Sequence, residues 1–402
     1  MRSEGVKAAV SDAGAAAPQY GAAAKAEWGL APELANLNHG SFGSTPLAVM
    51  AAQDAWRRRI EANPTRFMSR ESRPLLREAA RRVAAQLGSE GDDLVFSENA
   101  TSAANAVLRS LDFKPGDEIL ITSLGYPAIR NAALYVASRA GARVVEVEIA
   151  LPVRDAESIL SAVEAKLTGR TRVAIFDHIC SGSALVLPVE RLTEAAHRAG
   201  AAVLIDGAHV PGQLPLDLAG LGVEYYVGNL HKWLMAPRGT GFLWARRDLQ
   251  PALHPLTISH GYRKGFIEEF DWTGTKELTG WLSAPAGIEF FHRMGGERLM
   301  TRNRELAHAM ARMLSGAWAT PLAGPLEMFA AMAVLALPNA GPATPERSTE
   351  LRLHLAEQHG IEAAVGAADG RLWVRIMAQA YNEPADYDRL RHAFERGARS
   401  DL

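Results

Sequence analysis

The sequence has little of what marks membrane, nucleic-acid-binding and disulfide-rich proteins. Cys180 is the only cysteine among 402 residues, which excludes an intrachain disulfide and a cysteine-rich zinc site, so we expect no metal. One cysteine fits a reducing cytoplasm. No stretch approaches the roughly 18 apolar residues of a membrane span. The formal net charge of −2, without blocks of like charge, predicts no nucleic-acid or membrane partner. We therefore expect a small-molecule ligand.

Short apolar segments alternate with helical patterns over the first part of the chain. This alternation predicts βαβ units and a mainly parallel sheet covered on both faces. After Gly280 the pattern changes to two long helices, a strand RLWVRIM and a closing helix from Pro384, which indicates a smaller α+β domain. The strands expected in the sheet are 94–97, 118–122, 144–149, 173–176, 203–206, 224–229 and 241–245.

Two charged residues stand at the ends of neighbouring strands in this pattern. One buried-looking strand ends at Asp206, and the strand EYYVGN is followed closely by Lys232. Their separation leaves room for a crossover, so both side chains can lie at one edge of a parallel sheet. A carboxylate keeps the pyridine nitrogen of pyridoxal 5'-phosphate (PLP) protonated, and a lysine in an apolar setting can attack its aldehyde. Taken alone, Asp206 could be a cap or turn residue and Lys232 a solvated surface charge.

The segment that carries these residues resembles a known enzyme family. AAVLIDGAH followed by EYYVGNLHKW is similar to the core of the fold type I PLP-dependent enzymes of the class V aminotransferase group, which has a D-x-x-H strand end and a [S/N]-x-H-K motif with the Schiff-base lysine. The loop NHGSFGSTP resembles the isopenicillin N epimerase branch. The resemblance implies an α/β fold type I PLP-dependent transferase with a mainly parallel seven-stranded sheet and a smaller C-terminal α+β domain. It also implies that Lys232 and Asp206 are catalytic.

The resemblance further implies a set of cofactor contacts. The turn at Ala100 and Thr101 would hold the phosphate, with Asn229 and His231 completing its shell. Tyr126 would stack on the pyridine ring, although a locally packed turn tyrosine is the alternative. Ser181 stands where relatives carry an asparagine for the phenolic oxygen, and His209 is a second choice for that oxygen. The expected cofactor residues are Ala100, Thr101, Tyr126, Ser181, Asp206, His209, Asn229, His231, Lys232 and Thr275.

The resemblance also implies substrate contacts and an oligomer. Arg375 would bind the substrate carboxylate with two parallel hydrogen bonds. The loop Asn38, His39 and Gly40 would close over the substrate. Thr275 would cross the interface of a homodimer to the partner's phosphate. Arg70 is a possible second anion contact, or simply a solvated arginine.

These interpretations divide the chain into four parts. Residues 1–25 are rich in alanine and glycine but lack the apolar core of a signal peptide, so we expect a disordered tail. Residues 26–50 form an N-terminal arm and active-site loop. Residues 51–290 form the PLP-binding large domain, and residues 291–402 the small C-terminal domain.

The resemblance leaves the reaction open. The chain has no cysteine after Cys180, which sets aside a cysteine desulfurase. We expect an isopenicillin N epimerase-like enzyme acting at Cα of an amino acid or peptide-like derivative, with Lys232 moving protons and Tyr126 or His39 as a second base. The alternatives are a C-S lyase of the ergothioneine type that eliminates at Cβ, a class V aminotransferase, and a non-catalytic PLP-fold binding protein.

Overall fold

The computed structural model describes residues 18–397. Of the predicted tail 1–25, residues 1–17 lie outside this range, but residues 21–25 belong to a 3-10 helix, η1 (Gly21–Glu27). The predicted tail is therefore too long. The start of η1 is fixed to the C-terminal part of the fold, because Gly21 N–H donates to the Ala380 carbonyl at 2.8 Å. The buried Trp28 ring also contacts Tyr381 edge-on, with centroids 5.0 Å apart.

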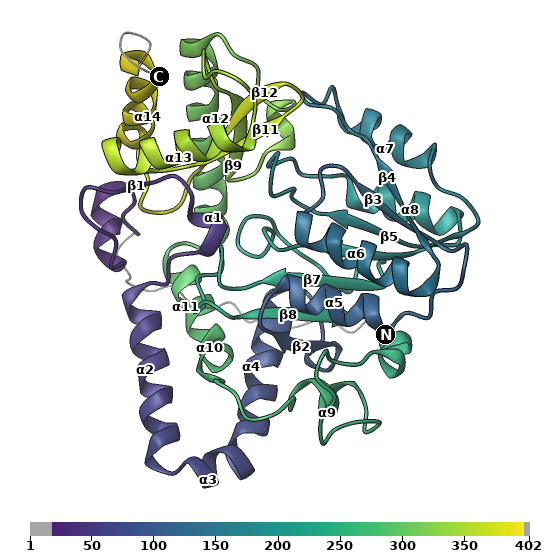
Figure 1. Cartoon of the computed structure of the whole chain (residues 1–402). Helices are drawn as coiled ribbons and strands as arrows, with labels where there is room; N and C mark the ends of the chain where they lie inside the picture. Colours follow the sequence, from purple (N-terminus) through teal and green to yellow (C-terminus); the bar gives the residue numbers. More distant parts are fainter. Residues whose placement is uncertain (1–17, 398–402) are drawn as a thin grey trace, which may run out of the picture.

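A seven-stranded sheet forms the centre of the larger part of the fold (Figure 1), which confirms the expected architecture. Its order is β2-β8-β7-β6-β5-β3-β4. All neighbouring strands run parallel except for β8, which is antiparallel to both β2 and β7. The strands are β2 (Leu94–Ser97), β3 (Glu118–Thr122), β4 (Arg143–Val147), β5 (Thr171–Asp177), β6 (Ala202–Asp206), β7 (Tyr225–Asn229) and β8 (Gly241–Ala245).

Both faces of this sheet are buried, because alternate strand residues enter two different apolar clusters. Ile119 and Ile121 pack with α5 (Ala100–Ser110) and α6 (Pro127–Ala140), whereas Leu120 faces the other cluster. That second cluster contains α7 (Ala156–Glu164) and α8 (Val189–Arg198). Double burial explains why the strands read as continuous apolar runs.

Two helices project from the sheet as a hairpin (Figure 1). They are α2 (Leu47–Ala62) and α4 (Ser72–Gln86), joined by α3 (Pro64–Arg66) and the π-helical turn η2 (Phe67–Glu71). Arg70 lies exposed in η2, at the tip of this hairpin.

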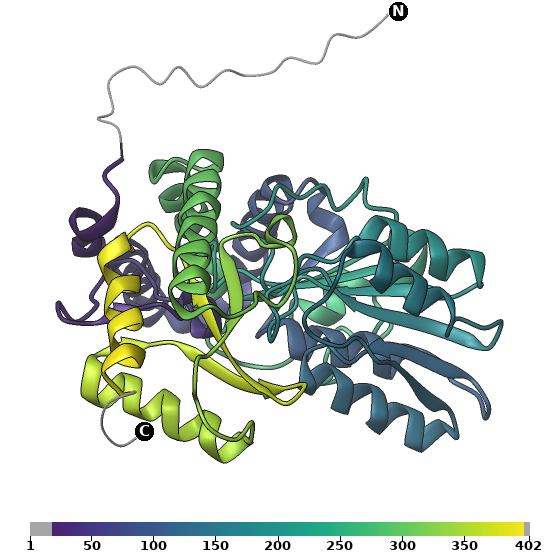
Figure 2. The same cartoon turned by 90° about the horizontal axis from the view of Figure 1, so that it is seen from above.

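The C-terminal part contains an antiparallel sheet of order β11-β12-β9. Its strands are β9 (Met332–Ala336), β11 (Ala364–Ala368) and β12 (Arg371–Met377), and its helices are α12 (Glu297–Trp318), α13 (Pro345–His359) and α14 (Pro384–Gly397). Figure 2 shows these helices and strands grouped on one side of the molecule. The short elements elsewhere are α1 (His39–Phe42), η3 (Gly91–Asp93), η4 (Arg247–Ala252), α9 (Phe266–Phe270), α10 (Thr279–Leu282) and η5 (Leu326–Met328).

Two features bear on the expected domain boundaries. β1 (Ala35–Asn36) pairs in parallel with β10 (Ile361–Glu362), so the N-terminal arm is joined to the C-terminal part. The expected boundary after residue 290 falls inside α11 (Ala284–Arg293). We propose the glycine pair 295–296 instead, where both residues have positive φ and the helix has ended.

Within residues 18–397, no helix is both long enough and apolar enough to cross a membrane.

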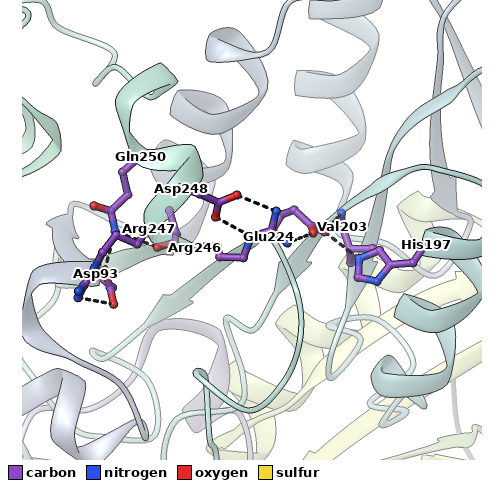
Figure 3. A network of polar contacts seen from close by, with 9 residues as sticks. Asp93, His197, Val203, Glu224, Arg246, Arg247, Asp248 and Gln250 are labelled. Carbon is purple, nitrogen blue, oxygen red and sulfur yellow. Dashed lines mark hydrogen bonds and ion pairs between the residues drawn. The ribbon is translucent and has the colours of Figure 1, made fainter.

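A polar network lies at the end of the sheet where the parallel strands begin (Figure 3). Glu224, which directly precedes β7, accepts from Val203 N–H at 2.8 Å, from His197 Nε2 at 3.0 Å and from Arg246 Nη1 at 2.6 Å. These three donors satisfy the hydrogen-bonding capacity of the buried Glu224 carboxylate, which lies before the start of β7.

Candidate active site

A cavity of about 430 Å³ opens at the carboxyl ends of β5, β6 and β7 and the first turn of α5. This is the edge of a parallel sheet where ligands usually bind. The expected residues that line it are Ala100, Thr101, Tyr126, Ser181, Asp206, His209, Asn229, His231 and Lys232. Asn38, His39, Gly40, Thr275 and Arg375 are not among the lining residues.

Lys232 and Asp206 are buried together in this cavity. Burial is the main cause that lowers the pKa of Lys232 to about 8, while nearby Asp206 favours the charged amine and Arg375 opposes it. Burial raises the pKa of Asp206, and the Ala208 N–H, which donates at 2.9 Å, together with Lys232 limits the rise. A lysine of lowered pKa has an appreciable neutral, nucleophilic fraction near neutral pH.

The hydrogen bonds of His209 independently indicate a neutral Lys232. Trp233 Nε1 donates to His209 Nδ1 at 3.4 Å, and an indole nitrogen can only donate. The Nε2 of a neutral imidazole must then carry the proton. His209 Nε2 lies 3.1 Å from Lys232 Nζ and can donate to this nitrogen when the amine is neutral, so the contact favours the unprotonated form of Lys232. Burial lowers the pKa of His209 well below its usual value, which keeps the ring neutral.

The first turn of α5 is arranged by two asparagines. Asn99 Oδ1 caps the helix by accepting from Ser102 N–H at 2.8 Å, and Asn229 Oδ1 accepts from Ala100 N–H at 2.9 Å. The Ala100 amide is therefore engaged by Asn229 rather than open to a phosphate. The Thr101 amide and hydroxyl have no recorded partner among residues 18–397, so this turn keeps donors at the positive end of a helix.

The His231 ring forms a hydrogen bond with the main-chain carbonyl of Thr240. Its Nδ1 lies 3.0 Å from the Thr240 carbonyl, which can only accept, so Nδ1 carries the proton and Nε2 is left as an acceptor. Burial lowers the pKa of His231 to about 4, although the bond to Thr240 opposes this. The expected phosphate contact through Nε2 therefore needs a proton on that nitrogen, which this tautomer does not carry.

Asp177 is a site residue that the sequence reasoning missed. It ends β5, directly opposite Asp206 in the register of the two strands, and lines the same cavity. Burial, then the charge of Asp206, raises its pKa well above the usual value. Its Oδ1 accepts from the Tyr126 N–H at 3.4 Å, and the Ser181 N–H also donates to its carboxyl group. Asp177 thus ties together two loops that line the cavity. The strand-end aspartate in FDHIC was the available signal.

Arg375 joins three elements beside the cavity. Its Nη2 donates to Ser41 Oγ at 2.7 Å and to Asn38 Oδ1 at 3.2 Å, and its Nη1 donates to both oxygens of Ser181, with Ser181 Oγ at 3.2 Å. The buried Nε has no acceptor among the described residues. Burial lowers the pKa of Arg375 to about 10, with Tyr126 opposing the shift, so the guanidinium remains a cation near neutrality.

His39 lies behind Lys232 and does not face the cavity, contrary to expectation. Its Nε2 lies 2.9 Å from the Lys232 carbonyl and its Nδ1 lies 3.0 Å from Tyr381 Oη. Both ring nitrogens are therefore occupied, and burial lowers its pKa to about 4 despite the bond to Lys232. With both nitrogens occupied, the structure offers no ring nitrogen of His39 to a substrate.

Gly40 is also structural, which corrects its expected role. A Cβ at this position would lie 2.9 Å from Trp233 Cζ2, and the Gly40 N–H donates to Met377 Sδ at 2.9 Å. Ser41 and Phe42, the next residues of the loop, line the cavity instead. Their exposure to the cavity follows from the single helical turn of α1, which turns His39 and Gly40 inward.

Two expected contacts lie outside the cavity in the single chain. Thr275 lies in the connection between α9 and α10, and its expected contact with a partner subunit stays a prediction. Arg70, at the tip of the α2–α4 hairpin, is not brought to the cavity. Other lining residues that the sequence reasoning did not single out are Asn99, Ile179 and Ala208.

Comparisons with known proteins agree with this arrangement. The family model "Aminotransferase class-V" matches residues 40–370. Isopenicillin N epimerase of Amycolatopsis lactamdurans is 34% identical over 393 residues, covering 92% of this chain and 97% of that protein. A probable chloroplastic L-cysteine desulfhydrase of Arabidopsis thaliana is 32% identical over 391 residues, covering 90% of this chain and 82% of that protein.

A solved structure shows the same fold. The apo structure of a cysteine desulfurase from Thermococcus onnurineus NA1 matches with a TM-score of 0.81 at 21% identity, covering 95% of this chain and 99% of that chain. The strand order, the cavity at the strand ends and the match over residues 40–370 lead to one conclusion. The chain belongs to the class V aminotransferase family of fold type I enzymes.

Proposed function

We propose that this enzyme removes and returns the Cα proton of an amino acid or peptide-like amino acid derivative, in the manner of an isopenicillin N epimerase. The observation that carries the proposal is the place of Lys232, a buried amine 3.1 Å from His209 Nε2 in a cavity shared with Asp206. Isopenicillin N epimerases rank among its relatives at 34% and 32% identity.

The residues of the cavity fit PLP, the cofactor of this family. The open donors of Thr101 at the start of α5 suit a phosphate, the buried carboxylate of Asp206 suits a protonated pyridine nitrogen, and the neutral Lys232 amine suits an aldehyde. When bound, PLP supplies an electron sink for the charge left at Cα.

Different side chains bind the substrate and move its proton. Arg375 is the cation that binds the α-carboxylate, and Asn38 and Ser41 hold its Nη2 in place. Lys232 accepts the Cα proton, and an unprotonated amine is the form that can do so. Tyr126, which lines the cavity with an exposed side chain, is the remaining residue of the two expected for the opposite face, since His39 is occupied.

A C-S lyase is the second candidate, because L-cysteine desulfhydrases are among the relatives at 32% identity. Both reactions begin with loss of the Cα proton, and the lyase then expels sulfur from Cβ. Desulfuration through a cysteine nucleophile is disfavoured, because Cys180 is fully buried and burial, followed by the nearby Asp177, raises its thiol pKa well above the usual value. An aminotransferase comes third.

Product analysis separates these reactions. The holoenzyme is incubated in deuterium oxide with a panel of amino acids and cysteine conjugates, and products are measured by mass spectrometry. If the enzyme is an epimerase, we expect deuterium at Cα in an intact amino acid. If it is a lyase, we expect pyruvate, ammonia and a sulfur fragment. The lysine-to-alanine variant at Lys232 should abolish either activity. Full activity in Lys232→Ala, or exchange with no amino acid tested, would contradict the proposal.

We further propose that the active unit is a homodimer in the cytoplasm. The support is Thr275, whose place in the α9–α10 connection leaves it outside the cavity of its own chain. Sedimentation of the PLP-bound protein tests the dimer, and a fully active monomer would overturn it.

A further inference from the structure

A second cavity, of about 400 Å³, adjoins the first. Tyr126 and Ser181 line both cavities, and Arg375 lies in the wall of the second. We call this space the distal cavity. We propose that the distal cavity receives the part of the substrate beyond Cβ, and that this part is extended, uncharged and contains an amide group. The proposal rests on the proposed function, because it assumes that Arg375 holds the α-carboxylate at the boundary of the two cavities.

The walls of the distal cavity are apolar or small. Leu124, Leu151 and Trp373 supply large apolar surfaces, whereas Gly366 and Ala367 leave room. Arg375 is the only charged side chain among the lining residues. A second charged group on the substrate would therefore find no charged partner of its own in this lining. An alkyl group would lose little free energy on leaving water for these walls, whereas an amide would need a hydrogen-bond partner.

One wall is formed by β11 and β12. Among residues 18–397, β11 is the edge strand of its sheet and pairs with β12 alone. The hairpin turns through two residues, Asp369 and Gly370, which both have positive φ, so Ala368 and Arg371 form the closing pair. Hydrogen-bonded and non-hydrogen-bonded pairs alternate along an antiparallel ladder, so the main-chain groups of Ala367 point away from β12.

A side-chain contact agrees with this direction. Val365, two residues before Ala367 and therefore on the same edge, offers its carbonyl to Ser348 Oγ at 2.7 Å. Outside the β11–β12 ladder, the N–H and carbonyl of Ala367 have no hydrogen-bond partner among residues 18–397. An extended amide can pair with such an edge by adding a short strand, with the cavity walls selecting its side groups.

The distal cavity is held open by the fold. The Leu151 N–H donates to Asp369 Oδ2 at 2.8 Å, which ties the tip of the hairpin to the segment that follows β4. A binding site that is already ordered before the ligand arrives pays a smaller entropic cost on binding than a flexible site does.

Three cysteine conjugates test the proposal: S-methylcysteine, S-hexylcysteine and S-(N-butylcarbamoylmethyl)cysteine. For each, the rate of Cα proton exchange or sulfur release gives kcat/KM, and calorimetry on the holoenzyme gives the affinity. We expect kcat/KM for the amide conjugate to exceed that for S-methylcysteine by at least about 10-fold, with the hexyl conjugate between them.

Gly366→Leu is designed to fill the distal cavity. A Cβ at Gly366 meets no atom within 4 Å, so the substitution is compatible with the fold. We expect it to remove the preference for both long conjugates while leaving S-methylcysteine unchanged. Gly316→Leu is the matched control, because Gly316 is exposed in α12 and a Cβ there also meets no atom within 4 Å. This control should keep the wild-type preference.

Ala367→Pro tests the strand edge separately. It deletes one N–H that the ladder does not use, a position where an edge strand tolerates proline. The amide conjugate should fall to the level of the hexyl conjugate. An unchanged preference in Gly366→Leu, or weaker binding of the long conjugates than of S-methylcysteine by the wild type, would overturn the proposal. If no conjugate reacts, the proposed function fails, and the calorimetric comparison of wild type with Gly366→Leu still decides the distal cavity.

Discussion

His39 Nε2 donates a hydrogen bond to the main-chain carbonyl of Lys232 across 2.9 Å. The carbonyl can only accept, so His39 Nδ1 accepts from Tyr381 Oη, whose oxygen in turn accepts from Asn36 Nδ2 at 2.8 Å. A continuous chain of hydrogen bonds thus runs from β1 to the backbone of the reactive lysine. The position of the amine depends on a segment that is remote from it in sequence.

The first prediction concerns this chain of bonds. His39→Phe removes both hydrogen bonds and should displace Lys232, lowering the rate of Cα proton exchange by about 100-fold, since misplacement by an ångström costs that much. Tyr381→Phe is the control, because it leaves the bond from His39 to Lys232 in place and should cost less. Circular dichroism checks that both variants fold. Equal losses in the two variants would argue against positioning through His39.

The second prediction concerns the pH dependence of Lys232. In the cofactor-free protein, the rate at which Lys232 reacts with added PLP should rise as the pH passes about 8, because only the neutral amine reacts. Trp233→Phe frees His209 Nδ1 to carry the proton, so that Nε2 can accept from a charged lysine. Hydrogen bonding to the charged form raises its pKa, and the curve should move to higher pH by about one unit.

Trp244→Phe is the matched control for this shift. Trp244 is buried and its Nε1 donates to Ser89 Oγ at 2.7 Å, away from the cavity. Its pH curve should coincide with that of the wild type. A Trp233→Phe curve that also coincides with the wild type would show that the indole does not set the state of Lys232.

The third prediction separates the charge of Asp177 from its hydrogen bonds. Because burial and the nearby Asp206 raise the pKa of Asp177 well above the usual value, Asp177→Asn replaces a group that is readily protonated and keeps an acceptor for the Tyr126 N–H. We expect wild-type exchange rates and stability. Asp177→Ala removes the acceptor of the Tyr126 and Ser181 N–H groups and should cost about 2 kcal/mol in urea unfolding, about 1 kcal/mol for each lost hydrogen bond. A severe loss of activity in Asp177→Asn would indicate that a negative charge is required.

The fourth prediction uses the network in Figure 3. Glu224→Ala removes the acceptor for Val203 N–H, His197 and Arg246. We expect the free energy of unfolding to fall by about 2 kcal/mol, since hydrogen bonds to a charged group contribute amounts of this size. The exchange rate at Cα should be unchanged, because the network lies at the opposite end of the strands from Lys232. Urea unfolding and the exchange assay test the two halves separately.

The parts of the site that follow from strand periodicity could be predicted. Asp206 and Lys232 stand at the ends of apolar runs, and parallel strands bring such ends to one edge, so their meeting needed no knowledge of the rest of the chain. Asp177 obeys the same rule, because it ends β5 directly opposite Asp206, and could have been predicted in the same way.

The parts that depend on burial from distant segments could not be predicted. His39 and Gly40 belong to a loop that reads as a substrate contact, and only the packing of Trp233, Met377 and Tyr381 shows that they face inward. The local sequence does not determine which of several polar residues forms a hydrogen bond with a distant segment.

The pairing of β1 with β10 has a consequence for biosynthesis. Ala35 and Asn36 leave the ribosome early, but their partners Ile361 and Glu362 are made near the end of the chain. The large sheet can assemble while translation continues, whereas Asn38 and Ser41 must wait for Arg375 to be synthesised. The contacts of Arg375 and the bond between Tyr381 and His39 are therefore completed last, so the substrate-facing residues and the support of Lys232 both wait for the C-terminal part of the fold.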